Sequence, residues 1–164
     1  MKSRRNREFE AFFRKTKDPV FRSLIVAVGA RDAAEEAVAE AFTRALANWA
    51  SVRRHPTPEG WVTKTALNYA RSVHRSMVRV ATDDVPDVPV SDDPPIDPEV
   101  IRRLLALPQR QREVIAFRVV LGLSTKDTAE FLQIAEGTVT AHLFRGLTRL
   151  QEELAATAPK EAWS

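Results

Sequence analysis

The sequence has no cysteine, only five glycines and no long apolar run. Without cysteine the chain cannot form disulfides, and it cannot build a zinc or iron–sulfur site on thiolate ligands. No apolar run approaches the roughly 20 residues that a membrane-spanning helix needs, so we expect no membrane insertion. The basic N-terminus is followed by an amphipathic stretch with acidic residues, not by the apolar core of a signal peptide. We therefore expect a soluble, cytoplasmic protein.

Catalytic patterns are missing as well. The sequence contains no nucleophile–base pair, no glycine-rich phosphate loop and no His-Glu-x-x-His pattern. His142 has no second ligand at metal-binding spacing beside it. We expect no enzymatic activity, no metal, no cofactor and no small-molecule substrate.

Charge is distributed unevenly along the chain. The net charge is +3, but residues 1–79 carry +8, residues 80–99 carry −7 and residues 100–164 carry +2. A basic segment beside a short acidic connector favours a polyanionic partner such as nucleic acid. A solubilising surface next to a disordered linker explains the same charges equally well.

The acidic connector also divides the chain. Residues 80–97 are rich in proline and aspartate and contain no aromatic residue, so we expect an extended, flexible linker there. It separates an N-terminal domain, 1–79, from a C-terminal domain, 98–155, which is followed by a tail, 156–164. Each domain is small enough that partner binding should matter for its stability.

Both halves are predicted to be helical, which makes the fold class all-α with two small helical domains. Period-two strand patterns are absent. Asp18-Pro19, Thr57-Pro58 and Asp97-Pro98 each place a capping side chain before a proline at the first helical position. The predicted helices are 5–17, 19–29, 32–49, 58–78, 98–106, 109–121, 125–132 and 136–154.

The C-terminal half has the pattern of a helix-turn-helix. Ser124 opens a short helix, residues 133–135 make a tight connection, and a longer helix follows with an apolar stripe on one face. The second helix of this motif lies in the DNA major groove. The side chains on its polar face that can reach bases and phosphates are Thr138, His142, Arg145 and Arg149. A plain helical hairpin with a solvated basic face is the alternative.

The helix predicted over 58–78 has two distinct faces. One is apolar, and the other carries an aromatic ring, an amide and four cations without one acid. This composition suits a nucleic-acid strand, because the ring can stack on a base and the cations can neutralise phosphates. A solvated charged face, the alternative, usually mixes signs. The residues are Trp61, Lys64, Asn68, Arg71, Arg75 and Arg79.

Acidic residues line one face of the helix predicted over 32–49. Asp32, Glu36 and Glu40 follow one another at i, i+4 spacing and repel by a few tenths of a kcal/mol per pair. A basic protein partner would explain them. Stabilisation by the positive N-terminal end of the helix explains the first of them equally well.

Taken together, these features resemble a bacterial RNA polymerase sigma factor of the extracytoplasmic-function (ECF) group, which keeps conserved regions two and four. Residues 107–114 (LPQRQREV) are similar to the entry into region four. Residues 122–124 and 136–139 resemble its helix-turn-helix. Residues 32–42 resemble the helix of region two that binds core polymerase, and residues 58–61 resemble the segment that reads the −10 element.

The resemblance implies a subunit that binds core RNA polymerase and promoter DNA, helps to melt the DNA, and is held inactive by an anti-sigma protein. The acidic linker would run through the polymerase channel that RNA later occupies. The implied polymerase contacts are Asp32, Glu36, Glu40 and Phe42. The implied −10 contacts are Arg53, Arg54, Trp61, Lys64, Asn68, Arg71 and Arg75. The implied −35 contacts are Thr138, Thr140, Ala141, His142, Phe144, Arg145 and Arg149, with Arg110, Arg112 and Lys126 on phosphates.

The sequence departs from the family pattern at the turn. Gln133 stands where the family usually has glycine, so we expect a left-handed backbone at a non-glycine residue. Ala135 replaces the usual capping serine, at a cost of about 1 kcal/mol. Two other functions remain open at this point: a conventional helix-turn-helix regulator that binds duplex DNA without polymerase, and an adaptor that binds no DNA.

Overall fold

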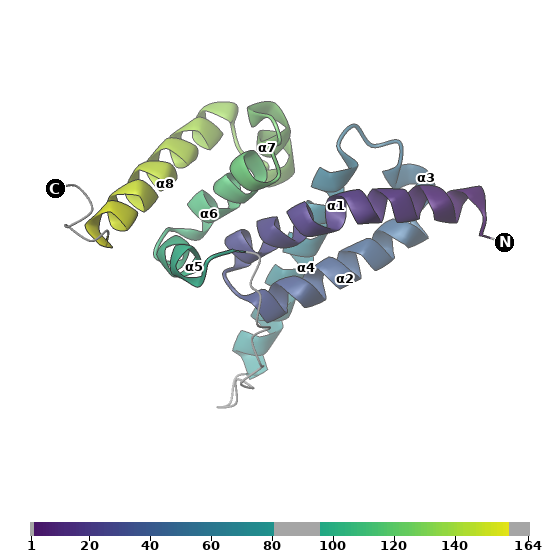
Figure 1. Cartoon of the computed structure of the whole chain (residues 1–164), viewed down its shortest axis with the longest axis horizontal. Helices are drawn as coiled ribbons and strands as arrows, with labels where there is room; N and C mark the ends of the chain where they lie inside the picture. The colour runs from purple at the N-terminus through teal and green to yellow at the C-terminus, as the bar shows by residue number, and fades with distance from the viewer. Residues whose placement is uncertain (1, 81–95, 158–164) are drawn as a thin grey trace.

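The structure, a computed structural model, describes residues 2–80 and 96–157, and these ranges are helical and contain no strand (Figure 1). The predicted all-α class is confirmed. The predicted linker lies almost entirely outside the described residues, as does most of the tail. The N-terminal helices are α1 (Arg4–Val28), α2 (Arg31–Ala47), α3 (Trp49–Val52) and α4 (Pro58–Val80). The C-terminal helices are α5 (Pro98–Leu105), α6 (Gln109–Ile115), η1 (Ala116–Val120), α7 (Thr125–Leu132) and α8 (Glu136–Thr157).

The two helical parts pack against each other. In Figure 1, α1 lies along α2 and α4, and the second part sits beside the C-terminal half of α1. Buried apolar residues of both parts form one continuous cluster, from Val20 in α1 to Val139 in α8. Within the described ranges, no helix is long and apolar enough to cross a membrane.

The helix break predicted at Pro19 is wrong, because α1 continues through it. A proline inside a helix removes one backbone donor and costs about 3 kcal/mol. Val20, Leu24 and Ile25 are buried directly after it. Burial of such side chains contributes about 1.5–3 kcal/mol each, which offsets the cost. The helix ends at Gly29, whose left-handed backbone (φ +79°) lets its N–H donate to the Ile25 carbonyl at 2.7 Å.

An aromatic cluster joins α1 to the end of α2. The helix predicted over 32–49 ends at Ala47, and the short α3 begins at Trp49. The Trp49 ring lies 5.4 Å from the ring of Phe9 and 5.1 Å from that of Phe12. The second helix therefore bends where its last aromatic side chain can enter the core.

The predicted caps of the C-terminal half are confirmed. The Asp97 carboxylate accepts a hydrogen bond from the Glu99 N–H at 2.8 Å, and the Ser124 hydroxyl accepts one from the Asp127 N–H at 3.0 Å. The helix predicted over 109–121 is present from Gln109 to Val120. Its second half widens into the π-helical turn η1, in which the Leu121 N–H donates to the Ala116 carbonyl at 2.9 Å.

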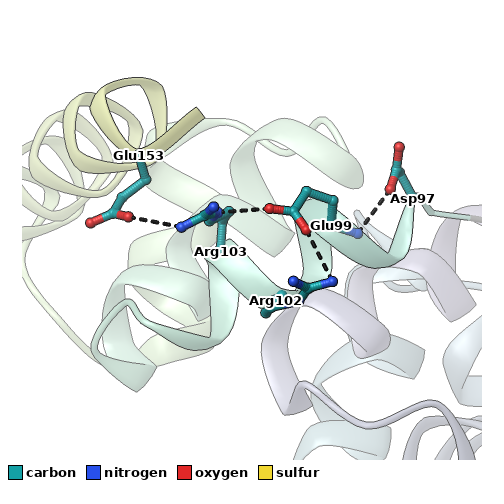
Figure 2. Close-up of polar contacts among 5 residues, drawn as sticks. All are labelled: Asp97, Glu99, Arg102, Arg103 and Glu153. Atoms are coloured by element: carbon teal, nitrogen blue, oxygen red, sulfur yellow. Dashed lines mark hydrogen bonds and ion pairs between the residues drawn. The ribbon is translucent and has the colours of Figure 1, made fainter. Parts of the chain in front are cut away.

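Ion pairs connect the start of the C-terminal part to its last helix. Figure 2 shows Arg103 of α5 between Glu99, at 3.0 Å, and Glu153 of α8, at 3.3 Å. Arg102 pairs with Glu99 as well, at 3.0 Å. Pairs near the surface contribute at most about 1 kcal/mol each. The buried Leu104 therefore contributes more than these pairs to holding α5 in place.

Candidate nucleic-acid interface

The connection between α7 and α8 has the geometry of a helix-turn-helix. Gln133 closes α7 in the left-handed region, at φ 56° and ψ 47°, as its position predicted. The Ile134 N–H donates to the Ala129 carbonyl at 3.1 Å across this turn. A non-glycine residue in this conformation costs about 1–2 kcal/mol, which the packing of the two helices must offset.

The inner face of α8 packs on α6 and α7. Val139 is fully buried, while Leu147 of the predicted apolar stripe remains exposed. At Gly146 the helices approach closely: a Cβ there would lie 3.0 Å from Ile115 Cδ1 and 3.4 Å from Gln111 Cβ. The close packing at Gly146 was not predicted, although a lone glycine within a helical pattern is a signal of it.

The outer face of α8 presents most of the residues predicted to read duplex DNA. Phe144 is 71 % exposed, an unusual position for a large apolar ring. Ala141 and His142 are half-buried, and His142 Nδ1 has no hydrogen-bond partner among the described residues. Lys126 of α7 is exposed too. The exposed members of the predicted set on α8 are Thr138, Thr140, Phe144, Arg145 and Arg149.

The strand-binding residues predicted on α4 do not share one environment. Asn68 is exposed, whereas Trp61, Lys64 and Arg71 are half-buried. Burial lowers the pKa of Lys64, and the positive charge of Arg71 lowers it further. Glu113 acts in the opposite direction. The side chain of Arg75 lies outside the described residues.

The loop before α4 contributes two further predicted contacts. Arg53 forms an ion pair with Glu8 at 3.3 Å, which ties the loop to α1. Arg54 is exposed. His55, between them and α4, accepts a hydrogen bond from the Thr57 N–H on its Nδ1 atom at 3.0 Å.

The buried carboxylate of Glu113 pairs with cationic side chains from both halves of the chain. Glu113 is 1 % exposed and accepts hydrogen bonds from Arg71, from Gln109 Nε2 at 3.1 Å and from Arg110 Nη1 at 2.9 Å. These four side chains and His74 line a cavity of about 510 Å³. Sequence reasoning missed this cluster. The available signal was a single acid amid the cations of residues 107–114.

Two of the three predicted phosphate contacts make bonds within the fold. Arg110 pairs with Glu113, and Arg112 Nη1 donates to the Leu107 carbonyl at 2.9 Å. Burial lowers the pKa of Arg112. Arg112 therefore stabilises the turn between α5 and α6, and it is not part of the proposed DNA surface.

The acidic face predicted on α2 is present. Asp32 and Glu36 are exposed, and Glu40 is half-buried beside Arg44, at 3.0 Å. The Tyr69 hydroxyl donates to Glu36 at 2.9 Å, and this bond raises the pKa of Tyr69. Phe42 differs from the others. It is 4 % exposed and packs into the aromatic cluster, so it holds α2 on the core. It is not part of the proposed polymerase-contacting surface.

Comparisons with known proteins agree with this geometry. The family model "Sigma-70, region 4" matches residues 98–150. The RNA polymerase sigma-E factor of Streptomyces coelicolor is 28 % identical over 154 residues, which cover 91 % of this chain and 87 % of that protein. The ECF RNA polymerase sigma factor SigD of Mycobacterium tuberculosis is 42 % identical over 50 residues, covering 30 % of this chain and 24 % of that one.

Solved structures match the chain over both helical parts. The sigma factor RpoE from Bartonella quintana, determined with the anti-sigma factor NepR, has a TM-score of 0.76 at 22 % identity. The match covers 92 % of this chain and 98 % of RpoE. CnrH, determined with the cytosolic domain of CnrY, has a TM-score of 0.62 at 17 % identity over 93 % of this chain and 91 % of CnrH. At this level of identity the two matches establish the fold.

Proposed function

We propose that this chain is a sigma factor of the ECF group of the sigma-70 family and that it directs RNA polymerase to promoters through two DNA-contacting surfaces of its own. One surface is the outer face of α8, and the other is the polar face of α4. The observation that carries the proposal is the outer face of α8. It leaves a phenyl ring and two guanidinium groups in solvent on the second helix of a helix-turn-helix.

We propose that α8 enters the major groove at the −35 element. The groove is about 12 Å wide and admits one helix. Arg145 has the fork of donors that guanine accepts, and Phe144 can contact a thymine methyl group. The exposed Arg149 of α8 and Lys126 of α7 would neutralise phosphates. Thr138 and Thr140 would add hydroxyl contacts at the start of the helix.

We propose that α4 and the loop before it hold the separated strand at the −10 element. Trp61 would stack on a base, which is worth about 1–3 kcal/mol, and the exposed Asn68 would hydrogen-bond another. Lys64 and Arg71 would neutralise phosphates, with Arg53 and Arg54 at the loop. Capture of unstacked bases offsets the cost of melting, which is a few kcal/mol per flipped base.

Protein partners complete the proposal. The acidic face of Asp32, Glu36 and Glu40 suits a basic surface of core polymerase, since a carboxylate face would repel DNA. RpoE and CnrH were each determined with another protein, NepR and CnrY, and we infer an anti-sigma partner here too. The chain would act in the cytoplasm and supply no catalytic group.

Run-off transcription with core polymerase on a genomic fragment library tests the function. We expect new discrete start sites that require the chain, and their loss in Arg145→Ala. Arg102→Ala removes the same charge from α5, outside both proposed surfaces, and should retain the start sites. If no start sites appear while the chain alone retains specific duplex fragments, the chain is a conventional regulator.

A premelted template separates the two surfaces. Trp61→Ala should lower the yield on duplex promoters and recover most of it when the −10 region is supplied as a mismatched bubble, because the melting cost is then removed. Arg145→Ala should stay defective on the bubble, because the −35 element is still duplex. Equal defects of Trp61→Ala on both templates would refute a role in melting.

A further inference from the structure

Two carboxylates of the acidic face on α2 are bound by side chains of the protein itself. The Tyr69 hydroxyl of α4 donates to Glu36 Oε1 at 2.9 Å, and Arg44 Nε lies 3.0 Å from Glu40 Oε1. The Arg44 guanidinium also lies over the Tyr69 ring, 5.6 Å from its centroid. These four side chains, the Tyr69 cluster, join the acidic face of α2 to α4.

Tyr69 reaches the acidic face because α2 and α4 pack closely against each other. The fully buried residues of the two helices include Ala37, Ala41 and Ala66, and side chains this small let helix axes approach. Tyr69 is half-buried, with its ring against the core and its hydroxyl at the surface. Its neighbour in the chain is Asn68, which is proposed to bind the separated DNA strand. The strand-binding helix therefore also supports the acidic face.

The bond from Tyr69 holds Glu36 in place and leaves it able to bind a cation. A carboxylate has two oxygens and about four acceptor sites, and Tyr69 uses one site on Oε1. The same bond raises the pKa of Tyr69, so its hydroxyl keeps the proton that it donates at neutral pH. An exposed glutamate normally loses rotamer freedom when it binds a partner. For Glu36 this loss has already occurred in the folded chain, so docking costs less.

Arg44 stabilises the second carboxylate of the Tyr69 cluster. Glu36 and Glu40 are spaced i, i+4 on α2 and repel each other. The positive charge of Arg44, next to both the Tyr69 ring and Glu40, reduces this repulsion. With Asp32, three carboxylates stand against this one guanidinium, so the face stays negative. The face can therefore attract a basic partner while its side chains hold fixed positions.

We propose that Tyr69 is a positioning residue for core polymerase: from α4 its hydroxyl holds Glu36, and its ring holds Arg44 beside Glu40, in the arrangement that a basic surface of the polymerase binds. This inference rests on the proposed function and adds to it a residue that acts through the carboxylates of α2. Tyr69→Phe isolates the hydroxyl, because phenylalanine keeps the ring under Arg44.

The rates of core polymerase binding to a fluorescent chain test the proposal. Because the sequence has no cysteine, Glu152→Cys at an exposed position of α8 accepts a single dye. We expect Tyr69→Phe in this chain to weaken binding about three- to tenfold, as the rotamer freedom of Glu36 returns. The loss should appear as faster dissociation with unchanged association, because the charge that steers encounter is the same. Unchanged or tighter binding would overturn the proposal, since tighter binding means that Tyr69 competes with the polymerase for Glu36.

A double-mutant cycle tests whether Tyr69 acts through Glu36. Glu36→Asp keeps the charge but shortens the side chain by one methylene, which takes the carboxylate away from the Tyr69 hydroxyl. It should weaken polymerase binding at least as much as Tyr69→Phe does. In the Glu36→Asp background, Tyr69→Phe should have no further effect, because the bond is already broken. A loss of the same size in both backgrounds would contradict the proposal.

Thr63→Val separates positioning from a general loss of stability in α4. Thr63 is 1 % exposed, and its hydroxyl donates to the Glu59 carbonyl at 2.8 Å. We expect valine there to lower the melting temperature and leave the affinity for core polymerase unchanged. Equal weakening by Thr63→Val and Tyr69→Phe would refute the positioning role.

The original chain in the same assay distinguishes the two levels of inference. If it binds no core polymerase, the proposed function fails and this inference fails with it. If it binds and Tyr69→Phe binds equally well, only the positioning role of Tyr69 fails.

Discussion

Replacing Gln133 by glycine should stabilise the chain. Gln133 has φ 56° and ψ 47°, which costs a residue with a Cβ about 1–2 kcal/mol. Glycine has no such penalty, but its freer unfolded chain costs about 0.4–1 kcal/mol. Because the side chain is exposed, no packing is lost. The net gain should be about 0.5–1 kcal/mol in the free energy of unfolding, or about 1–4 °C in melting temperature.

Urea unfolding followed by far-ultraviolet circular dichroism measures this gain. Gln133→Ala is the matched control, since it removes the same side chain and keeps the left-handed strain. We expect Gln133→Ala to stay close to the original chain and Gln133→Gly to unfold at a higher urea concentration with the same slope. If Gln133→Gly is no more stable than Gln133→Ala, the turn does not have the strain that the dihedral angles of Gln133 indicate.

Three further predictions concern caps, core and charge. Ser124→Ala should lower the free energy of unfolding by about 1 kcal/mol in urea titrations, because the Asp127 N–H loses its acceptor. The control Ser51→Ala, at an exposed position of α3, should change the free energy of unfolding little. Phe117→Ala should cost about 3–5 kcal/mol in the same assay, since the ring is fully buried, and a loss below about 1 kcal/mol would contradict its place in the core. Lys64→Gln should raise stability at neutral pH and weaken promoter melting. The folded state depresses the pKa of Lys64, so it binds fewer protons than the unfolded chain between that pKa and 10.5, and the stability of the original chain should rise with pH across this window. The gain from Lys64→Gln should therefore shrink between pH 7 and pH 10.

Local signals predicted most helix boundaries of the C-terminal half. Asp97 and Ser124 act within three residues of themselves, and each forms the backbone hydrogen bond that its position indicates. The left-handed turn at Gln133 was predicted from the resemblance, because Gln133 stands where the family usually has glycine. At Pro19 the local signal failed, because it predicted a helix start and α1 continues through this residue. The burial that keeps α1 continuous comes from helices far along the chain.

Some features of the candidate site could be predicted from the sequence, and others could not. Exposure of Arg145 and Arg149 follows from their place on the polar face of α8, which the helical period alone predicts. The exposed Phe144 was named only by the resemblance to the family. The pattern on α4 also separates polar from apolar residues, but it carries no information about a second domain packed on the polar face. Half-burial of Lys64 therefore had no sequence signal, and the single acid amid the cations of residues 107–114 did not identify Arg71 as its partner.

The sequence by itself determined the all-helical class, the helix-turn-helix pattern and the residue types of the two proposed DNA surfaces, because periodicity, caps and turn residues act over one to five positions. Only the tertiary structure decided which of those residues are accessible. Contacts between Arg71 and Glu113, or between Gly60 and Phe131, join residues 42 and 71 positions apart. Such contacts depend on how two amphipathic surfaces meet in space, and the pattern of either surface alone does not specify its partner.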